Sequence, residues 1–188
     1  MFRISDSNRS ILRDASCDPI CLCEELLPVL LRRGAWVRRL QATTAGSAIE
    51  ELGAALRESL GGLEARAIRA VLDREATAAT GLGDDVAVPH AVVAGLTRPL
   101  VALGFAPDGI DFNAPDGQPA KIIFLMLIPP RAHDQEVRIL AQIARAAIES
   151  KSRERLLKAN SLPDVLALLG SSLAATATPR RRTSLADI

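Results

Sequence analysis

The 188-residue sequence has few of the residues on which several classes of protein depend. It contains no tyrosine, and aromatic residues make up only 3% of the chain, so stacking platforms for single-stranded nucleic acid are hard to assemble. It also lacks a surplus of one charge, because 23 Lys and Arg residues nearly balance 22 Asp and Glu residues. Since nucleic-acid binders normally carry a basic excess, we expect no nucleic-acid partner. Histidine is scarce as well, and only His90 and His133 are available for histidine chemistry.

Long apolar runs are missing too. The longest uncharged apolar run, residues 122–128, is far shorter than the roughly 20 residues that a membrane-spanning helix needs. The first residues are polar and do not resemble a signal peptide, so we expect a cytoplasmic protein with no direct membrane insertion. The three cysteines, Cys17, Cys21 and Cys23, are odd in number and come with no fourth metal ligand. They favour buried thiols over a disulfide framework or a metal site.

Helical and strand periodicities alternate along the middle of the chain. This pattern predicts an α/β fold, a mixed β-sheet flanked by helices on both faces, in a single domain. The continuous apolar run at residues 121–128 indicates a central strand covered on both sides. The other expected strands are 86–88 and 100–105, with turns at 107–109 and 115–117, and the expected helices are 47–60, 63–75, 135–148, 153–158 and one that begins at 161–164. Ser47 and Glu50 fit a capping box for the first of these helices.

The expected domain boundaries follow from composition. Residues 1–19 are expected to form a polar lead-in, 20–170 the domain, and 171–188 a disordered tail whose arginines at 180–182 are solvated. Trp36 lies in an arginine-rich stretch, and we favour packing against the protein's own core over a contact surface.

His90 is the best candidate for chemistry. The glycines Gly81 and Gly83 permit tight turns, and Pro89 restricts the backbone that presents the imidazole. Arg74, at the end of a predicted helix, is suited to neutralising an anionic group beside that ring. From spacing alone, a purely structural histidine in a turn stays an open alternative. A metal site that joins Asp84 or Asp85 to His90 is a more remote one, because adjacent loop aspartates more often face water.

At these residues the sequence resembles the type-2 enzyme IIA domains of the bacterial sugar phosphotransferase system, a family that includes fructose, mannitol and nitrogen-regulatory members. The resemblance covers roughly residues 20–170, and its blocks follow the family's order: Leu72-Asp73-Arg74-Glu75, Thr80-Gly81-Leu82-Gly83, Val86-Ala87-Val88-Pro89-His90, residues 109–119, the strand before Pro129-Pro130, and residues 139–144.

The resemblance implies that His90 accepts a phosphoryl group from the histidine-containing phosphocarrier protein. The group would pass to an enzyme IIB, or its presence would signal to a regulated target protein, and no cofactor would be needed. Arg74 matches the family's active-site arginine, and Thr80, Gly81 and Gly83 lie in the loop that would surround the phosphoryl group. Such a site needs a fixed ring with one free nitrogen and a nearby cation.

The sequence departs from the family at one position. Where the family usually has a second histidine at the start of the long helix, this chain has Glu136, whose carboxylate would repel a phosphoryl group. His133 precedes it by about one helical turn and is either a substitute for that histidine or a surface residue at the helix start. We expect a phosphocarrier, regulatory rather than sugar-transporting. The alternative is a regulatory or binding module that keeps the fold but has lost phosphotransfer.

Overall fold

The computed structural model describes residues 26–147 and 150–177, with side chains described as far as Leu173. Its elements in chain order are α1 (Leu26–Arg33), β1 (Ala35–Val37), α2 (Ala45–Ala55), α3 (Arg57–Leu60), the 3₁₀ turn η2 (Gly61–Leu63), α4 (Glu64–Thr77), β2 (Gly81–Gly83), β3 (Val86–Ala87), β4 (His90–Val92), β5 (Leu100–Ile110), β6 (Ala120–Ile128), α5 (His133–Ala147), α6 (Ser150–Leu157) and α7 (Leu162–Ala177). The cysteine cluster and the arginines at 180–182 lie outside the described residues.

The strands form one mixed sheet of six strands in the described part of the chain, in which β1, β5, β6, β3 and β2 are neighbours in that order. β4 pairs with β6 as well, further along β6 than β3 does. The central pair β5 and β6 is antiparallel, whereas β1 runs parallel to β5, and β3 and β4 run parallel to β6. β6 therefore forms the base on which both β3 and β4 are positioned.

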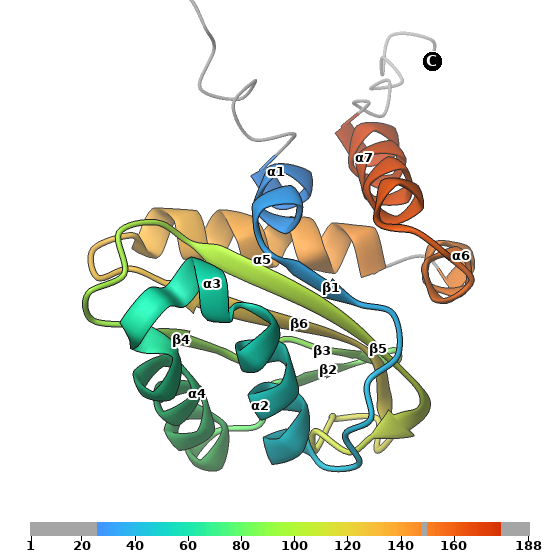
Figure 1. Cartoon of the computed structure of the whole chain (residues 1–188). Coiled ribbons are helices and arrows are strands. Elements are labelled where there is room, and N and C mark those ends of the chain that lie inside the picture. Colours follow the sequence, from blue (N-terminus) through green and yellow to red (C-terminus); the bar gives the residue numbers. More distant parts are fainter. Residues whose placement is uncertain (1–25, 148–149, 178–188) are drawn as a thin grey trace, which may run out of the picture.

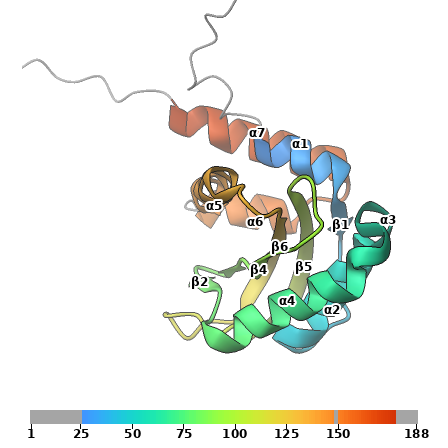
Figure 2. The same cartoon turned by 90° about the vertical axis from the view of Figure 1, so that its left-hand side faces the viewer.

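Helices cover both faces of this sheet, as Figures 1 and 2 show. On one face lie α2, α3 and α4, and on the other lie α1, α5, α6 and α7. Side chains of β6 alternate between the two cores: Ile123 and Leu125 pack toward α2 and α4, and Phe124 and Met126 pack toward α1 and α5. The predicted central strand and the predicted α/β fold with helices on both faces are confirmed.

The first predicted helix needs correction. The segment expected as one helix over 47–60 is α2 followed by α3, with Leu56 between them. Its capping box is formed by Thr44 and Ser47, not by Ser47 and Glu50: the Thr44 hydroxyl accepts from the Ser47 N–H at 3.2 Å, and the Ser47 hydroxyl accepts from the Thr44 N–H at 3.1 Å. The helix starts earlier than expected because Thr44 is itself a competent cap.

Two strand expectations also change. β5 does not end at Phe105 but continues to Ile110, and the expected turn at 107–109 is an irregularity in its pairing with β6, where Gly109 has φ +77°. The strand expected at 86–88 stops at Ala87, and a separate strand begins at His90. Pro89 separates them because it has no N–H to donate to the ladder.

The C-terminal expectation changes as well. The boundary expected at residue 170 falls inside α7, which continues to Ala177 and buries Leu173. Within the described ranges, no helix combines the length and apolar character needed to cross a membrane. Trp36 is half-buried and meets Phe105 edge to face, with ring centres 6.2 Å apart, as expected for a core residue.

Candidate functional site

His90 occupies the first position of β4, beside Met126 of the central strand. Its ring is held at one nitrogen, because Nδ1 lies 2.8 Å from the carbonyl oxygen of Val88. A carbonyl can only accept, so Nδ1 must carry the proton and Nε2 is the free nitrogen of the neutral ring. The side chain is 17% exposed, so most of the ring is covered by the protein.

A chain of hydrogen bonds on the Nδ1 side of the ring supports this orientation. The Val88 N–H donates to the carbonyl oxygen of Thr80 at 3.0 Å. Thr80 is in turn fixed by Glu75, whose carboxylate accepts the Thr80 N–H at 3.1 Å and also the Thr80 hydroxyl. Because Thr80 is only 5% exposed, these bonds are shielded from water and hold the backbone that positions the His90 ring.

The loop that carries Gly81 and Gly83 packs closely against the rest of the fold. The Gly81 N–H donates to the Phe112 carbonyl at 3.2 Å, and a Cβ added at Gly81 would lie 2.7 Å from that oxygen. Thr80 and Gly81 were predicted to bind a phosphoryl group, but their N–H groups already donate within the protein. Their visible role is to position His90, and a direct role in binding stays a prediction, as it does for Gly83.

Asp116 lies in the segment between β5 and β6 and is hydrogen-bonded to this loop. Its carboxylate accepts the Asp84 N–H at 2.8 Å and the Gln118 N–H at 3.0 Å. These two backbone donors favour the charged form and lower the pKa of Asp116 below its ordinary value. The ionised carboxylate therefore helps to hold the loop that carries Gly83.

Arg74 lies in the last turn of α4, a helix that packs against β4. Its Nη1 donates to the Ala78 carbonyl at 2.8 Å, which is a common way for arginine to satisfy a helix C-terminus. Between the described residues, no hydrogen bond or ion pair joins Arg74 to His90. The predicted neutralising role of Arg74 stays a prediction.

Glu136, in the first turn of α5, lies on the Nε2 side of the His90 ring. Its Oε1 lies 3.8 Å from His90 Nε2, and its Oε2 lies 3.1 Å from His133 Nδ1. His133, the first residue of α5, is 82% exposed and contacts Glu136. The structure thus brings both histidines to one carboxylate, with Glu136 between them. The role of His133 as a substitute for the family's second histidine stays a prediction.

Asp84 and Asp85 do not join His90. They form the turn between β2 and β3, with φ of 54° and 65°, as in the tight hairpin turns that require two left-handed residues. Asp84 pairs with Arg153 at 3.0 Å and Asp85 with Lys121 at 2.8 Å. Among the residues that the structure describes, no group of three or more His, Cys, Asp or Glu side chains is arranged to hold a metal ion.

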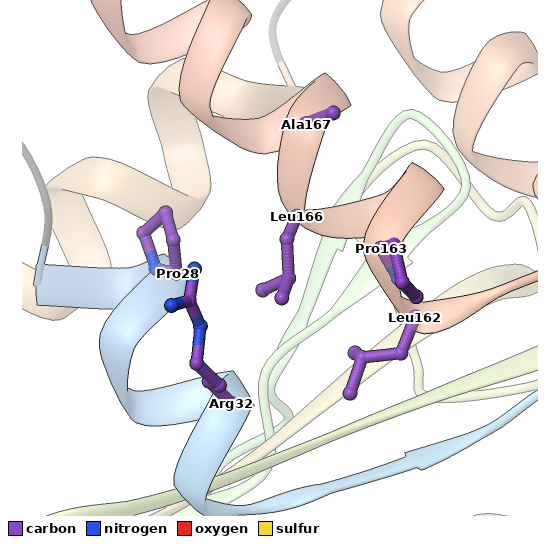
Figure 3. Close-up of a pocket in the computed structure, with 6 residues that line it drawn as sticks. All are labelled: Pro28, Arg32, Leu162, Pro163, Leu166 and Ala167. Carbon is purple, nitrogen blue, oxygen red and sulfur yellow. The ribbon is translucent and has the colours of Figure 1, made fainter.

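A separate groove lies between α1 and α7, shown in Figure 3. Its volume is about 580 Å³, and its lining is apolar except for Arg32. The lining residues are Pro28, Arg32, Leu162, Pro163, Leu166 and Ala167. None of them belongs to the His90 site, and they include no carboxylate, histidine or nucleophile.

With this geometry established, comparison with known proteins gives the family. Residues 30–172 match the model of the phosphoenolpyruvate-dependent sugar phosphotransferase system EIIA 2 family, and the chain belongs to that family. It is similar to the fructose-specific EIIA component of Haloferax volcanii, with 38% identity over 104 residues, covering 54% of this chain and 68% of the relative. It is also similar to the fructose-specific EIIABC component of Bacillus subtilis, with 34% identity over 92 residues, which cover 49% of this chain but only 14% of that longer protein.

Two solved structures are also similar. The nitrogen regulatory protein IIA-Ntr of Neisseria meningitidis has a TM-score of 0.68 at 28% identity, over 79% of this chain and 99% of that one. The mannitol enzyme IIA of Escherichia coli, solved as a complex with phosphorylated enzyme IIB, has a TM-score of 0.61 at 26% identity, over 72% of this chain and 94% of that one. The predicted resemblance is confirmed.

Glu75 is the site residue that the sequence analysis missed. It stands in the block with Arg74, but an acidic residue at a helix end gives no sign that it will hold a loop five residues later. The signal in the sequence for this contact was the nearby Thr80, whose hydroxyl can donate a hydrogen bond to a carboxylate.

Proposed function

We propose that this protein is a phosphocarrier that accepts a phosphoryl group on Nε2 of His90. The observation that supports this is the hydrogen bond from Nδ1 to the Val88 carbonyl, which leaves Nε2 free and fixes its direction. A nucleophile with these two properties is what phosphoryl transfer requires, since positioning supplies most of its rate.

The proposed transfer of the phosphoryl group between two histidine nitrogens needs no cofactor. The electron pair of Nε2 attacks the phosphorus of a phosphohistidine on the carrier protein, and the bond from phosphorus to the carrier's nitrogen breaks as the new bond forms. Nδ1 keeps its proton throughout and donates it in a hydrogen bond to the Val88 carbonyl oxygen. Arg74 would offset the negative charge after turning from the Ala78 carbonyl toward the ring.

The proposed donor is the histidine-containing phosphocarrier protein, and the reaction would take place in the cytoplasm. The proposed acceptor is an enzyme IIB or a regulated target protein. Support comes from the mannitol neighbour, whose structure was solved with phosphorylated enzyme IIB, and from the neighbour named as a nitrogen regulatory protein.

The test is labelling. The protein is incubated with phosphoenolpyruvate, enzyme I and the carrier protein, and an acid-labile phosphoryl adduct is sought. We expect the wild type and His133→Gln to be labelled and His90→Gln to remain unlabelled, because the His90 ring is held by the backbone with Nε2 free, whereas the His133 side chain is 82% exposed. Equal labelling of His90→Gln would contradict the proposal.

A second candidate is a regulatory or binding module with no phosphotransfer. It is favoured by the Glu136 carboxylate, which faces His90 Nε2 at 3.8 Å and would repel an incoming phosphoryl group. This candidate predicts that the wild type stays unlabelled in the same experiment and that His90→Gln leaves the biological effect intact.

A further inference from the structure

Glu136 is oriented by two contacts that the family's usual histidine would not need. It lies in the first turn of α5, where the helix dipole stabilises a negative charge. One oxygen, Oε2, is held 3.1 Å from His133 Nδ1, and the other, Oε1, is directed toward His90 Nε2 at 3.8 Å. With the Glu136 side chain 17% exposed, this is an ordered carboxylate rather than a solvated one.

A phosphoryl group on Nε2 would enter the space between the His90 ring and this carboxylate. Because 3.8 Å does not accommodate both, the Glu136 side chain must rotate back and would then lie beyond the phosphorus atom. A carboxylate there is a poor partner for the phosphoryl oxygens, since both are negative. It is a good partner for a water molecule, whose proton it can accept.

We propose that Glu136 makes the protein hydrolyse its own phosphohistidine, a step that rests on the proposed function of His90. A water molecule attacks the phosphorus in line with the bond to Nε2, and its proton passes to Glu136. The oxygen–phosphorus bond forms as the phosphorus–nitrogen bond breaks, and the electron pair returns to Nε2. The products are inorganic phosphate and a neutral His90 that still donates from Nδ1 to Val88.

His133 is a positioning residue in this step. Its ring holds Oε2 and thereby leaves Oε1 on the His90 side. Because His133 is 82% exposed, Glu136 lies beside solvent at this end of α5, and its carboxyl group releases the proton directly to water. The phosphorylated state would therefore limit its own lifetime, which suits a regulator that must return to its resting state without an acceptor.

The experiment measures the lifetime of the phosphorylated protein. The full chain is phosphorylated with the carrier system, the donors are removed, and release of inorganic phosphate is followed. We expect Glu136→Gln to slow the release about 100-fold, the lower range for loss of a general base, and Glu136→Asp to restore part of the rate. The matched control is Asp134→Asn, which removes an exposed charge from the same helical turn and should leave the rate unchanged.

A second measurement separates base catalysis from simple repulsion. Repulsion by Glu136 would speed return of the phosphoryl group to the carrier protein as much as it speeds hydrolysis. The proposal requires that Glu136→Gln slow hydrolysis far more than this return, and equal effects on both would overturn it. Loss of the His133 contact in His133→Ala should slow hydrolysis several-fold, and His133→Asn, which can still donate to Oε2, should rescue it.

The outcomes for the two proposals are distinguishable. A labelled wild type that releases phosphate no faster than Glu136→Gln overturns the inference and leaves His90 as the phosphoryl acceptor. If neither the wild type nor Glu136→Gln is labelled, the proposed function fails and the hydrolysis falls with it.

Discussion

The two nitrogens of His90 face regions of very different character. Nδ1 is bonded to Val88, and behind Val88 lies the buried Thr80, so this strand side is built from shielded backbone. Nε2 faces the helix side, where Glu136 and the exposed His133 form the first turn of α5. The comparison teaches that buried backbone holds the orientation of the ring, whereas one side chain at the rim, Glu136, faces the nitrogen that is proposed to react.

The strand side should be the more sensitive to substitution, and Gly81→Ala should have the largest effect. The added Cβ would lie 2.7 Å from the Phe112 oxygen and 2.8 Å from the Ala114 Cα, which are backbone atoms with little room to move. We expect a loss of about 3 kcal/mol in unfolding free energy, measured by urea denaturation. The control Gly62→Ala, with nothing within 4 Å of its Cβ, should show no loss. Similar values for both would contradict the close packing of this loop.

Thr80→Val tests the hydrogen bonds behind the ring. Valine keeps the shape of threonine but removes the hydroxyl that donates to Glu75, so a partly buried carboxylate loses a partner. We expect a loss of about 2 kcal/mol in unfolding free energy and slower phosphorylation of His90. In Thr77→Val the lost hydroxyl bond, to the Asp73 carbonyl, is exposed, and the loss should stay below about 0.5 kcal/mol. Unchanged stability in Thr80→Val would show that the strand side does not depend on Glu75.

Glu136→His tests the helix side. Two unit charges about 4 Å apart interact by about 4 kcal/mol at an effective dielectric constant near 20, and rotation of the side chain reduces this repulsion. Removing it should raise the rate of phosphorylation by the carrier protein about tenfold, equivalent to about 1.4 kcal/mol. Stopped-flow or rapid-quench labelling measures the rate, with Asp134→Asn as the control. A rate no higher than that of the wild type would mean that Glu136 already moves aside without cost.

The smallest expected effect concerns the pH dependence of the strand side. Because the pKa of Asp116 is lowered in the folded protein, its contribution to stability is complete above the unfolded pKa of about 3.9 and is lost as the pH falls through the folded pKa. Wild type should therefore be more stable than Asp116→Asn at pH 6, and the difference should shrink below about pH 4. Urea denaturation at several pH values measures it, and a difference independent of pH would contradict the assigned pKa shift.

Sequence patterns predicted the fold better than the details of the site. The apolar run of β6 identified the central strand because a strand covered on both faces needs apolar residues at every position. The motif around Pro89 made His90 the candidate residue because proline restricts the backbone locally. The cap at Thr44 and the continuation of β5 through Gly109 were missed, since neighbouring signals of equal strength competed there.

The contacts that decide the chemistry were beyond the reach of sequence patterns. Glu75 and Thr80 attract each other only because the turn after α4 folds back. Glu136 meets His90 only because α5 packs against β6, the strand to which β4 is paired. The position of Glu136 was known from the sequence, but the direction of its carboxylate was not.

The sequence by itself determined the family, the sheet between two helical layers and the histidine proposed to carry the chemistry, because apolar periodicity and the motif residues 80–90 are local properties of the chain. Only the tertiary structure decided which nitrogen of His90 is free, what holds the ring, and that a carboxylate stands between the two histidines. The reason is physical: a hydrogen bond or an ion pair depends on distances of a few ångströms between distant segments, and packing of the sheet and helices sets those distances.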